Sequence, residues 1–494
     1  MGGAGNMRSN ILRLSINITT LLVISVSYGQ NTWIKSYGGA WFDRAMSVVQ
    51  TADSTYTVIG TTESFGYGSP EASDIWLIKA NLSGDTILSK TYGEDAIIEE
   101  AYSIIETLTH DYVFSGTIMS EEGGIWLVKI DQAGDTLWTR TFGVGEFAIS
   151  IGSSVIETTD EGYLICGKVL SFDEPEKDLL LIKTDINGDT LWTRGYNMGL
   201  NDATHSVLET HDQEYLVVGT SDDGDCWILK TDANGDTLWT ETYGGAGFHA
   251  AYDLVRTDDQ CFVITGFTAS FESTQGDFWL FKIDSNGEIV WSHTYGDYHN
   301  EITSSLVQTN DGGFLMVGQK QNAGLANNDD LGWMVKTDSD GEVMWTRTYG
   351  SHGYNEMKAV IQTYDNGFLV VGRDSNADFW IIKTDSMGQT STSALIPTEK
   401  SDSFFRQITI SPNPTNSTCN IGYTLPVRSS VVLDIYDLSG TKIWSRKFSE
   451  QEAGRYNQFW NGTTNNGFEL SSGLYFLRVS ALSWHENRTI IFLK

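Results

Sequence analysis

Residues 226–243 read CWILKTDANGDTLWTETY, and versions of this stretch recur along most of the chain. Each of the first six of seven copies carries two large apolar residues twelve positions apart, here Trp227 and Trp239, and the last copy carries only the first of the pair. The first register comprises Trp76, Trp126, Leu180, Trp227, Trp279, Trp333 and Trp380, and the second Leu88, Trp138, Trp192, Trp239, Trp291 and Trp345. A repeat of about 50 residues is typical of supersecondary units that stack or are arranged radially.

Each repeat contains four strand-like runs. In the second copy they are YSIIETL (102–108), YVFSGTI (112–118), IWLVKID (125–131) and DTLWTRTFG (135–143). Alternating apolar and polar residues rich in Val, Ile, Thr and Tyr predict strands. An Asp/Gly turn such as DANGD joins the third and fourth runs, as in a β-hairpin. Four antiparallel strands per unit are typical of a propeller blade.

The two ends of the repeat region complement each other. The last repeat lacks a fourth run, whereas residues 32–39 (TWIKSYGG) match the fourth run of the fifth repeat, LWTETYGG. We therefore predict an all-β fold, a seven-bladed β-propeller over residues 30–388, closed by an N-terminal strand so that no sheet edge is left open.

The flanking segments differ from the repeats. Residues 1–29, with basic residues before an apolar run ending LLVISVSYG, predict a signal peptide, and no stretch predicts a membrane span. Residues 389–404 are polar and predict a linker. Seven short strand-like runs within residues 405–494 predict a small β-sandwich.

The C-terminal segment resembles the sorting domains of the type IX secretion system. The resemblance rests on SPNP (411–414), VLDIYDLSG (432–440), SGLYFLR (472–478) and the end RTIIFLK (488–494). The segment is also similar to the Ig-like domain of flagellar hook-capping proteins, through WNG (460–462). The repeats resemble those of secreted bacterial β-propellers, through DGGF (311–314) and WILKTD (227–232). These resemblances imply export by secretion machinery and a secreted or cell-surface protein, with the tail either cleaved or used as an anchor.

Charge and cysteine usage exclude several classes of function. The formal net charge of −33 disfavours nucleic acid, which needs a basic surface. Four scattered cysteines indicate neither a zinc site nor a disulfide framework. The turn Asp185–Asp189 places oxygen ligands at three calcium-loop positions, but its glycine is out of place and the closing glutamate is missing. We expect no cofactor, with calcium the one alternative, and a monomer.

Two rings of side chains are predicted around the central channel. The loops that enter the innermost strands contribute Asp43, Glu99, Ser150, Asp202, His249, Glu301 and Asn355. These residues either bind a ligand or cation at the channel mouth, or hold the loop of the neighbouring blade. At the far ends of the same strands stand Gln50, Glu106, Glu157, Glu209, Arg256, Gln308 and Gln362, on a face shared with Val48 and predicted to line the channel.

A threonine follows that second ring in every repeat: Thr51, Thr107, Thr158, Thr210, Thr257, Thr309 and Thr363. Its presence in all seven copies predicts a structural hydrogen bond.

The loops between second and third strands vary in length and lie at the first mouth. The longest, residues 319–332, offers Asn327, Asn328, Asp329 and Asp330 as ligand contacts, because variable loops on a rigid scaffold commonly bind. The fixed hairpins on the other face look architectural. We expect a non-catalytic module that binds a glycan or a surface protein. The alternatives are a polysaccharide-acting hydrolase at the acidic mouth and a structural envelope component. An enzyme is the less favoured class, since no G-x-S-x-G or H-E-x-x-H motif occurs.

Overall fold

The computed structural model describes residues 31–66, 72–120, 123–143, 149–170, 179–196, 203–221, 224–245, 247–269, 276–297, 299–322, 329–350, 352–391, 408–425, 429–437, 441–451, 454–481 and 484–494. Within these ranges the secondary structure is entirely β, with strands β1 to β35 and no helix. The predicted signal peptide and most of the predicted linker lie outside the described residues.

The repeat region forms four-stranded antiparallel sheets, and the described residues contain seven of them. The first four are β2 (Asp43–Gln50), β3 (Tyr56–Thr62), β4 (Asp74–Ala80) and β5 (Thr86–Tyr92); β6 (Ile98–Glu106), β7 (Tyr112–Met119), β8 (Gly124–Ile130) and β9 (Thr136–Phe142); β10 (Ile149–Glu157), β11 (Tyr163–Leu170), β12 (Leu179–Thr184) and β13 (Thr190–Tyr196); and β14 (Ala203–Glu209), β15 (Tyr215–Thr220), β16 (Cys226–Thr231) and β17 (Thr237–Tyr243).

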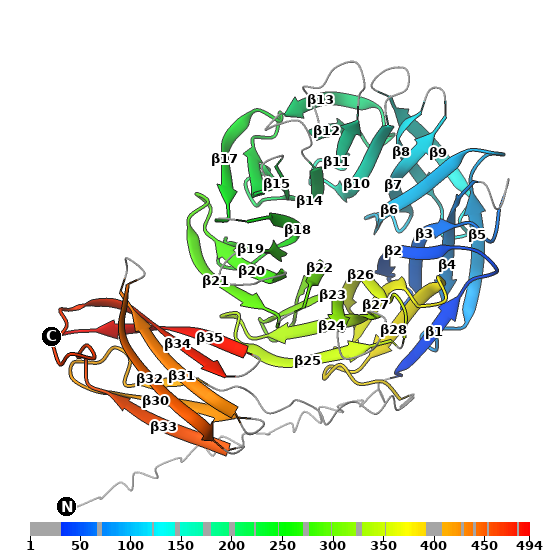
Figure 1. Ribbon diagram of the computed structural model, residues 1–494. Helices are drawn as coiled ribbons and strands as arrows, with labels where there is room; N and C mark the ends of the chain where they lie inside the picture. Colours follow the sequence, from blue (N-terminus) through cyan, green and yellow to red (C-terminus); the bar gives the residue numbers. More distant parts are fainter. Residues whose placement is uncertain are drawn as a thin grey trace, which may run out of the picture.

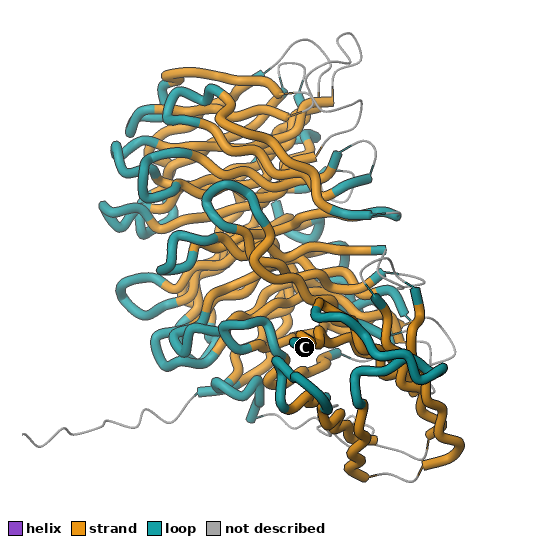
Figure 2. Tube along the Cα trace, turned by 90° about the vertical axis from the view of Figure 1, so that its left-hand side faces the viewer, coloured by secondary structure: helices purple, strands orange, loops and turns teal. Residues whose placement is uncertain are grey.

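The remaining three are β18 (His249–Arg256), β19 (Phe262–Thr268), β20 (Asp277–Ile283) and β21 (Ile289–Tyr295); β22 (Glu301–Gln308), β23 (Phe314–Asn322), β24 (Asp329–Thr337) and β25 (Val343–Tyr349); and β26 (Glu356–Gln362), β27 (Phe368–Arg373), β28 (Phe379–Thr384) and β1 (Trp33–Tyr37). The sheets are arranged radially, with the first strand of each around a central axis and the last strand outside (Figure 1). Seen from the side, the strands run between two faces that carry the loops (Figure 2).

The N-terminal strand completes the last sheet, as the sequence predicts. Strand β1 pairs antiparallel with β28, with Trp33 opposite Lys383 and Tyr37 opposite Phe379. The predicted all-β class and four-stranded repeat are therefore confirmed, together with the contribution of the first strand to the last sheet.

All seven innermost strands carry an irregularity at the same place. Their register against the second strand shifts by one residue, for example between Thr204 and Ser206 and between Met357 and Ala359. The extra residues include His205 and Lys358. A bulge re-aims the side chain it carries, so each repeat presents one additional residue near the axis.

The hydrophobic core consists of clusters that each span two neighbouring sheets. One cluster joins Trp33, Phe379 and Ile381 of the last sheet to Val58 and Trp76 of the first. The predicted packing role of the repeated tryptophans is confirmed, because Trp76, Trp227, Trp279, Trp333 and Trp380 are all buried in such clusters.

The outer strands of six of the seven sheets in the repeat region also fasten the hairpin of the next sheet. The Tyr92 hydroxyl donates to the carbonyl of Gly134 at 2.8 Å, and Tyr243 donates to Gly287 at 2.7 Å. The same bond recurs from Tyr37, Tyr196, Tyr295 and Tyr349 to Gly84, Gly235, Gly341 and Gly388. At the corresponding position β9 has Phe142, which cannot donate. These glycines lie in turns with positive φ, such as Gly235 at 78°, and a Cβ there would come within 3.0 Å of Trp192.

The C-terminal part is a two-sheet sandwich. One sheet contains β29 (Thr409–Ser411), β30 (Cys419–Leu425) and β33 (Gly454–Trp460), and the other β31 (Ser429–Tyr436), β32 (Lys442–Gln451), β34 (Gly473–Ala481) and β35 (Trp484–Phe492). Side chains from both sheets, including Tyr423, Trp460 and Leu477, share one buried core. Arg488 of this part pairs with Glu342 of the repeat region at 2.8 Å.

The four cysteines are free thiols, and three of them, Cys166, Cys226 and Cys419, are buried. Across the described residues no helix is long and apolar enough to cross a membrane.

Candidate functional site

The loop residues predicted to surround one channel mouth are buried between sheets. Backbone N–H groups of the preceding sheet's last loop donate to them: Gly39 to Asp43 Oδ2 (2.9 Å), Glu94 to Glu99 Oε1 (3.1 Å), Gly245 to His249 Nε2 (2.9 Å) and Asp297 to Glu301 Oε2 (3.4 Å). Each donor follows a glycine, and a Cβ on Gly296 would come within 2.7 Å of Glu301. This is the geometry of a loop anchor.

Of the remaining three members of this ring, Asn355 is also a buried anchor, and the side chains of Ser150 and Asp202 are not described. Asn355 is buried, receives the N–H of Ser375 at 3.2 Å, and donates to the carbonyl of Asp330 at 2.9 Å. Only the backbone of Ser150 is described, and Asp202 lies outside the described residues. The structure therefore favours the interpretation that these side chains hold neighbouring loops. Ligand binding by the ring stays a prediction.

Two anchor carboxyls are strongly perturbed. Burial raises the pKa of Glu99 to about 7, a hydrogen bond from the Glu94 backbone opposes the rise, and the negative charge of Asp74 adds to it. Burial likewise raises the pKa of Glu301 to about 8, against the attraction of Lys320. Such values occur in general acids. Both carboxyls are fully buried, however, so a substrate cannot reach them in this conformation.

One group of side chains has the composition of a metal site. Ligand atoms of Asp297, His299 and Glu301 lie within 4.8 Å of one another. The Lys320 ammonium already stands among them, 2.7 Å from Asp297 Oδ2 and 3.3 Å from Glu301 Oε1. Burial would raise the pKa of Asp297, but Lys320 and His299 lower it to about 2. A built-in cation thus supplies the charge that a metal ion would bring.

The Asp/Gly turns considered for calcium have a structural use. Asp185 Oδ1 accepts the backbone N–H groups of Asn187 and Asp189, each at 2.9 Å. The Asp232 and Asp284 carboxylates do the same in their turns. These Asx turns engage the oxygen that a calcium ion would need, so the geometry gives calcium no support.

Of the four residues predicted as ligand contacts in the loop 319–332, the structure describes two. Asn327 and Asn328 lie outside the described residues. Asp329 begins β24, is buried, and accepts the Gly353 N–H at 2.7 Å and the His352 ring nitrogen at 2.8 Å. Asp330 forms a bridge with Tyr354. Asp329 and Asp330 therefore fasten the loop that enters β26.

The repeated threonines form the predicted structural hydrogen bond and belong to a larger motif. Thr158 Oγ1 donates to Asp160 Oδ1 at 2.6 Å, and Lys183 Nζ donates to the same oxygen at 2.8 Å. Equivalent pairs join Lys79, Lys129, Lys230, Lys282, Lys336 and Lys383 to Asp53, Asp111, Glu214, Asp259, Asp311 and Asp365. Sequence reasoning missed these lysines, six of them buried and Lys282 nearly so, although a Lys interrupts every third run.

The far ends of the innermost strands clamp neighbouring sheets together. Backbone N–H groups donate to Glu157 (from Leu108), Glu209 (from Thr159), Gln362 (from Asn310) and Gln50 (from Tyr364), each at 2.8 Å, and to Glu106 (from Ala52) at 3.2 Å. The Tyr364 bond joins the last sheet to the first.

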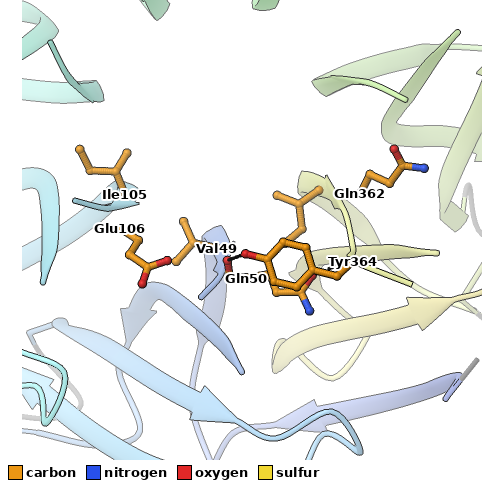
Figure 3. A pocket seen from close by; sticks show the side chains of 7 residues that line it. Val49, Gln50, Ile105, Glu106, Gln362 and Tyr364 are labelled. Atoms are coloured by element: carbon orange, nitrogen blue, oxygen red, sulfur yellow. Dashed lines mark hydrogen bonds between the residues drawn. The ribbon is translucent and has the colours of Figure 1, made fainter. Parts of the chain in front are cut away.

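A pocket opens at this end of the axis, between the last sheet and the first two (Figure 3). Its volume is about 360 Å³, and its lining consists of Val49, Gln50, Ile105, Glu106, Ile361, Gln362 and Tyr364. The Tyr364 side chain is prominent, at 66% exposure. Val48 does not line this pocket, because it is buried in a core cluster between the last sheet and the first. The prediction that Val48 lines the channel is therefore wrong. Its neighbour Val49, on the other face of β2, reaches the pocket. We call this site the axial pocket.

Radial four-stranded sheets followed by a small sandwich define the class of protein: a β-propeller with a C-terminal Ig-like domain. Residues 409–484 match the family model described as the FlgD Ig-like domain, which confirms that predicted similarity. No curated protein matches the chain.

Two solved structures illustrate how distant the structural likenesses are. Sqt1 from Chaetomium thermophilum is 10% identical, with 69% of this chain and 82% of that chain covered and a TM-score of 0.42. The BP39L lectin from Burkholderia pseudomallei is 8% identical, with 71% and 98% covered and a TM-score of 0.47. At these scores neither structure bears on the function of this chain.

Proposed function

We propose that this protein is a secreted or cell-surface binding module, in which a seven-bladed β-propeller recognises a glycan or surface protein without catalysing a reaction. The observation that carries the proposal is the axial pocket. It lies where the innermost strands of separate sheets end together, and its lining joins an exposed aromatic ring to amide, carboxylate and aliphatic side chains. Ligand sites are commonly concave, largely apolar and provided with a few placed polar groups.

The polar groups of the axial pocket suit the hydroxyl groups of a neutral sugar. Gln50 and Gln362 each use Oε1 to accept a backbone N–H, and neither amide nitrogen has a partner among the described residues. Those amides offer donors, and Glu106 offers acceptors. A hydroxyl group both donates and accepts, and the Tyr364 ring adds an apolar face for the sugar ring. The volume of about 360 Å³ is suitable for a small ligand.

Seven blades are supported by the seven four-stranded sheets that the described residues of the repeat region form, and by the pairing of β1 with β28. Joining the first strand to the last sheet closes the ring and removes exposed edges. We assign residues 30–388 to the propeller, 389–404 to a linker and 405–494 to the Ig-like sorting domain, after a signal peptide over residues 1–29.

Export through the C-terminal domain is the second part of the proposal. It is supported by the Ig-like match over residues 409–484 and by the terminal motifs that resemble type IX sorting domains. In a bacterium with that secretion system, the full chain should reach the cell surface or medium. Deletion of residues 405–494 should leave it in the periplasm, and undiminished export of the truncated chain would contradict the assignment.

The hydrolase hypothesis has one observation in its favour, the raised pKa values of Glu99 and Glu301. Their burial as loop anchors makes the binding role the better supported function.

A glycan array tests the binding role on the full chain without its signal peptide, with and without a calcium chelator. We expect binding to neutral glycans that the chelator leaves unchanged and that Tyr364→Ala abolishes. Leu108→Ala is the matched control, because Leu108 is an exposed residue that follows the ring threonine in another sheet. Binding that survives Tyr364→Ala would remove the axial pocket from the proposal. An array without signal in any form would favour a protein partner or a structural envelope role.

A further inference from the structure

Three basic side chains lie together where the last sheet meets the first. Arg44 is the second residue of β2, Lys358 is the bulged residue of β26, and Arg373 ends β27. The axial pocket lies at the other end of β2, at Gln50, roughly 20 Å away at about 3.3 Å per residue. We call Arg44, Lys358 and Arg373 the basic cluster.

The carboxylate of Glu356 pairs with all three cations. The Glu356 carboxylate lies 3.1 Å from Lys358 Nζ, 3.8 Å from Arg44 Nη1 and 3.9 Å from Arg373 Nε. Burial would raise the pKa of Glu356, but Lys358, Arg44 and Arg373 hold it below its ordinary value, so the carboxylate stays charged. These four side chains together carry two more positive than negative charges, in a chain whose net charge is −33. The carboxylates of Glu100 and Asp330, which act on Tyr102 and Tyr354 beside the cluster, reduce that surplus.

The two guanidinium groups have unused hydrogen-bond donors. Neither Arg44 nor Arg373 forms a side-chain hydrogen bond with the residues that the structure describes, and the Nε atom of each is buried without a hydrogen-bond partner among them. Their side chains are 25% and 18% exposed. A guanidinium carries five N–H donors, and buried donors are normally paired. Such an arrangement calls for an acceptor from outside the described chain.

Aromatic rings, rather than acceptors, hold the guanidinium groups in place. Arg373 Cζ lies 4.3 Å from the Tyr354 ring centroid and 4.9 Å from that of Phe42, while Arg44 Cζ lies 5.6 Å from the Phe42 ring. The Tyr354 hydroxyl lies 2.9 Å from Gln319 Oε1 and 3.0 Å from Glu356 Oε2 and can donate to either. Stacking fixes an arginine while leaving its N–H edge available.

Positive potential extends from the basic cluster across the channel. Burial, together with the charges of Lys168 and Lys358, lowers the pKa of His205 to about 4. Glu100, which accepts the hydroxyl of Tyr102, is a nearby opposing charge. Asp330, whose charge acts on Tyr354, is another.

We propose that the basic cluster binds the acidic group of a saccharide, a carboxylate or a sulfate, between the guanidinium groups of Arg44 and Arg373. The fork of an arginine matches both oxyanions with paired N–H···O bonds, and Lys358 adds a point charge. The exposed Tyr354 ring offers apolar surface for the sugar beside it. This inference rests on the proposed binding role of the propeller and adds an acidic sugar to its ligands.

Saturation-transfer NMR tests the proposal on the full chain carrying Tyr364→Ala, which takes the aromatic ring out of the axial pocket and its proposed neutral-sugar binding. The probes are D-glucuronate, D-glucose 6-sulfate and D-glucose at low ionic strength. We expect transfer to an acidic sugar and none to glucose; glucuronate alone identifies a carboxylate site, and glucose 6-sulfate alone a sulfate site. Arg44→Gln or Arg373→Gln should weaken binding about tenfold or more, because each removes charged hydrogen bonds. Arg140→Gln, which loses a surface pair with Asp189, is the control and should bind as wild type does.

Three results would overturn the inference: no saturation transfer to either acidic sugar, equal transfer to glucose, or unchanged binding in the two arginine variants. Inorganic sulfate should also displace the bound sugar from the wild-type protein, which tests the site without any substitution. If the NMR experiment shows no acidic-sugar site while binding on the array still depends on Tyr364, the acidic-sugar site is ruled out and the proposed binding function is not.

Discussion

The buried lysines of the propeller predict an asymmetry between the two partners of one ion pair. The Lys183 side chain is 2% exposed and that of Asp160 is 57% exposed. Asp160→Asn leaves a buried ammonium with the Thr184 carbonyl at 3.0 Å as its remaining strong acceptor. Breaking a buried pair in this way costs about 3–5 kcal/mol. Because the position of Asp160 is exposed, water can partly hydrate the Lys183 ammonium in the variant. We therefore expect Asp160→Asn to lower the free energy of unfolding by about 2–3 kcal/mol.

Lys183→Met should cost about 1 kcal/mol or less, because it removes the buried charge together with its desolvation penalty. Asp160 then faces water and still accepts the Thr158 hydroxyl and the Gly162 N–H. Burial would raise the pKa of Asp160, but its hydrogen bonds from Lys183 and Thr158 hold it below the ordinary 3.8. The stability that the charged Asp160 gives the wild type over Asp160→Asn is therefore present above about pH 4. It is lost as the pH falls through the lowered pKa of Asp160.

Urea denaturation followed by tryptophan fluorescence measures both variants against the wild type. Asp259→Asn is the matched comparison, since its partner Lys282 is 13% exposed and should be less penalised. The reasoning is refuted if Asp160→Asn is as stable as the wild type, or if Lys183→Met costs more than Asp160→Asn.

Two further predictions concern the contacts between sheets. Tyr243→Phe removes the hydroxyl that donates to Gly287 and should lower the free energy of unfolding by about 1 kcal/mol, whereas Phe142→Tyr supplies the bond that β9 lacks and should raise it by up to about 1 kcal/mol. Thermal denaturation measures both changes in stability. A Tyr243→Phe variant more stable than the wild type would contradict a stabilising role for the hydrogen bond from Tyr243 to Gly287. Glu99→Gln should stabilise the protein at pH 8 more than at pH 5. With its pKa raised to about 7, the folded carboxyl keeps a proton that the unfolded one releases near pH 4.5, so wild-type stability falls across that window. Denaturation at the two pH values tests this, and equal stabilisation at both would be inconsistent with a titrating Glu99.

Local patterns in the sequence were sufficient to predict the strands and their order. The alternation in YSIIETL and the turn DANGD each specify one element, and the match of TWIKSYGG to LWTETYGG predicts the pairing of β1 with β28. The seven runs of the C-terminal part all became strands. The strands and turns are determined within a few residues of chain, where pattern reasoning is strong, whereas the pairing of β1 with β28 follows from comparing the incomplete last repeat with the others.

The sites were harder to predict, because they depend on residues that the fold brings together from distant repeats. Gln50 and Tyr364 meet only when the ring closes, as do Arg44 and Arg373. Residue type alone was also ambiguous: Glu99 is a plausible ligand in the sequence and a loop anchor in the structure. The lysine of each third run was assigned no partner, since its Asp lies in a turn on another part of the repeat.

A crystal structure of the full chain with the tightest neutral glycan from the array would locate the bound sugar. We expect sugar density in the axial pocket, against the Tyr364 ring and the amides of Gln50 and Gln362. Density at the anchor residues Glu99 or Glu301, or at the loop before Asp329, with an empty axial pocket would contradict it.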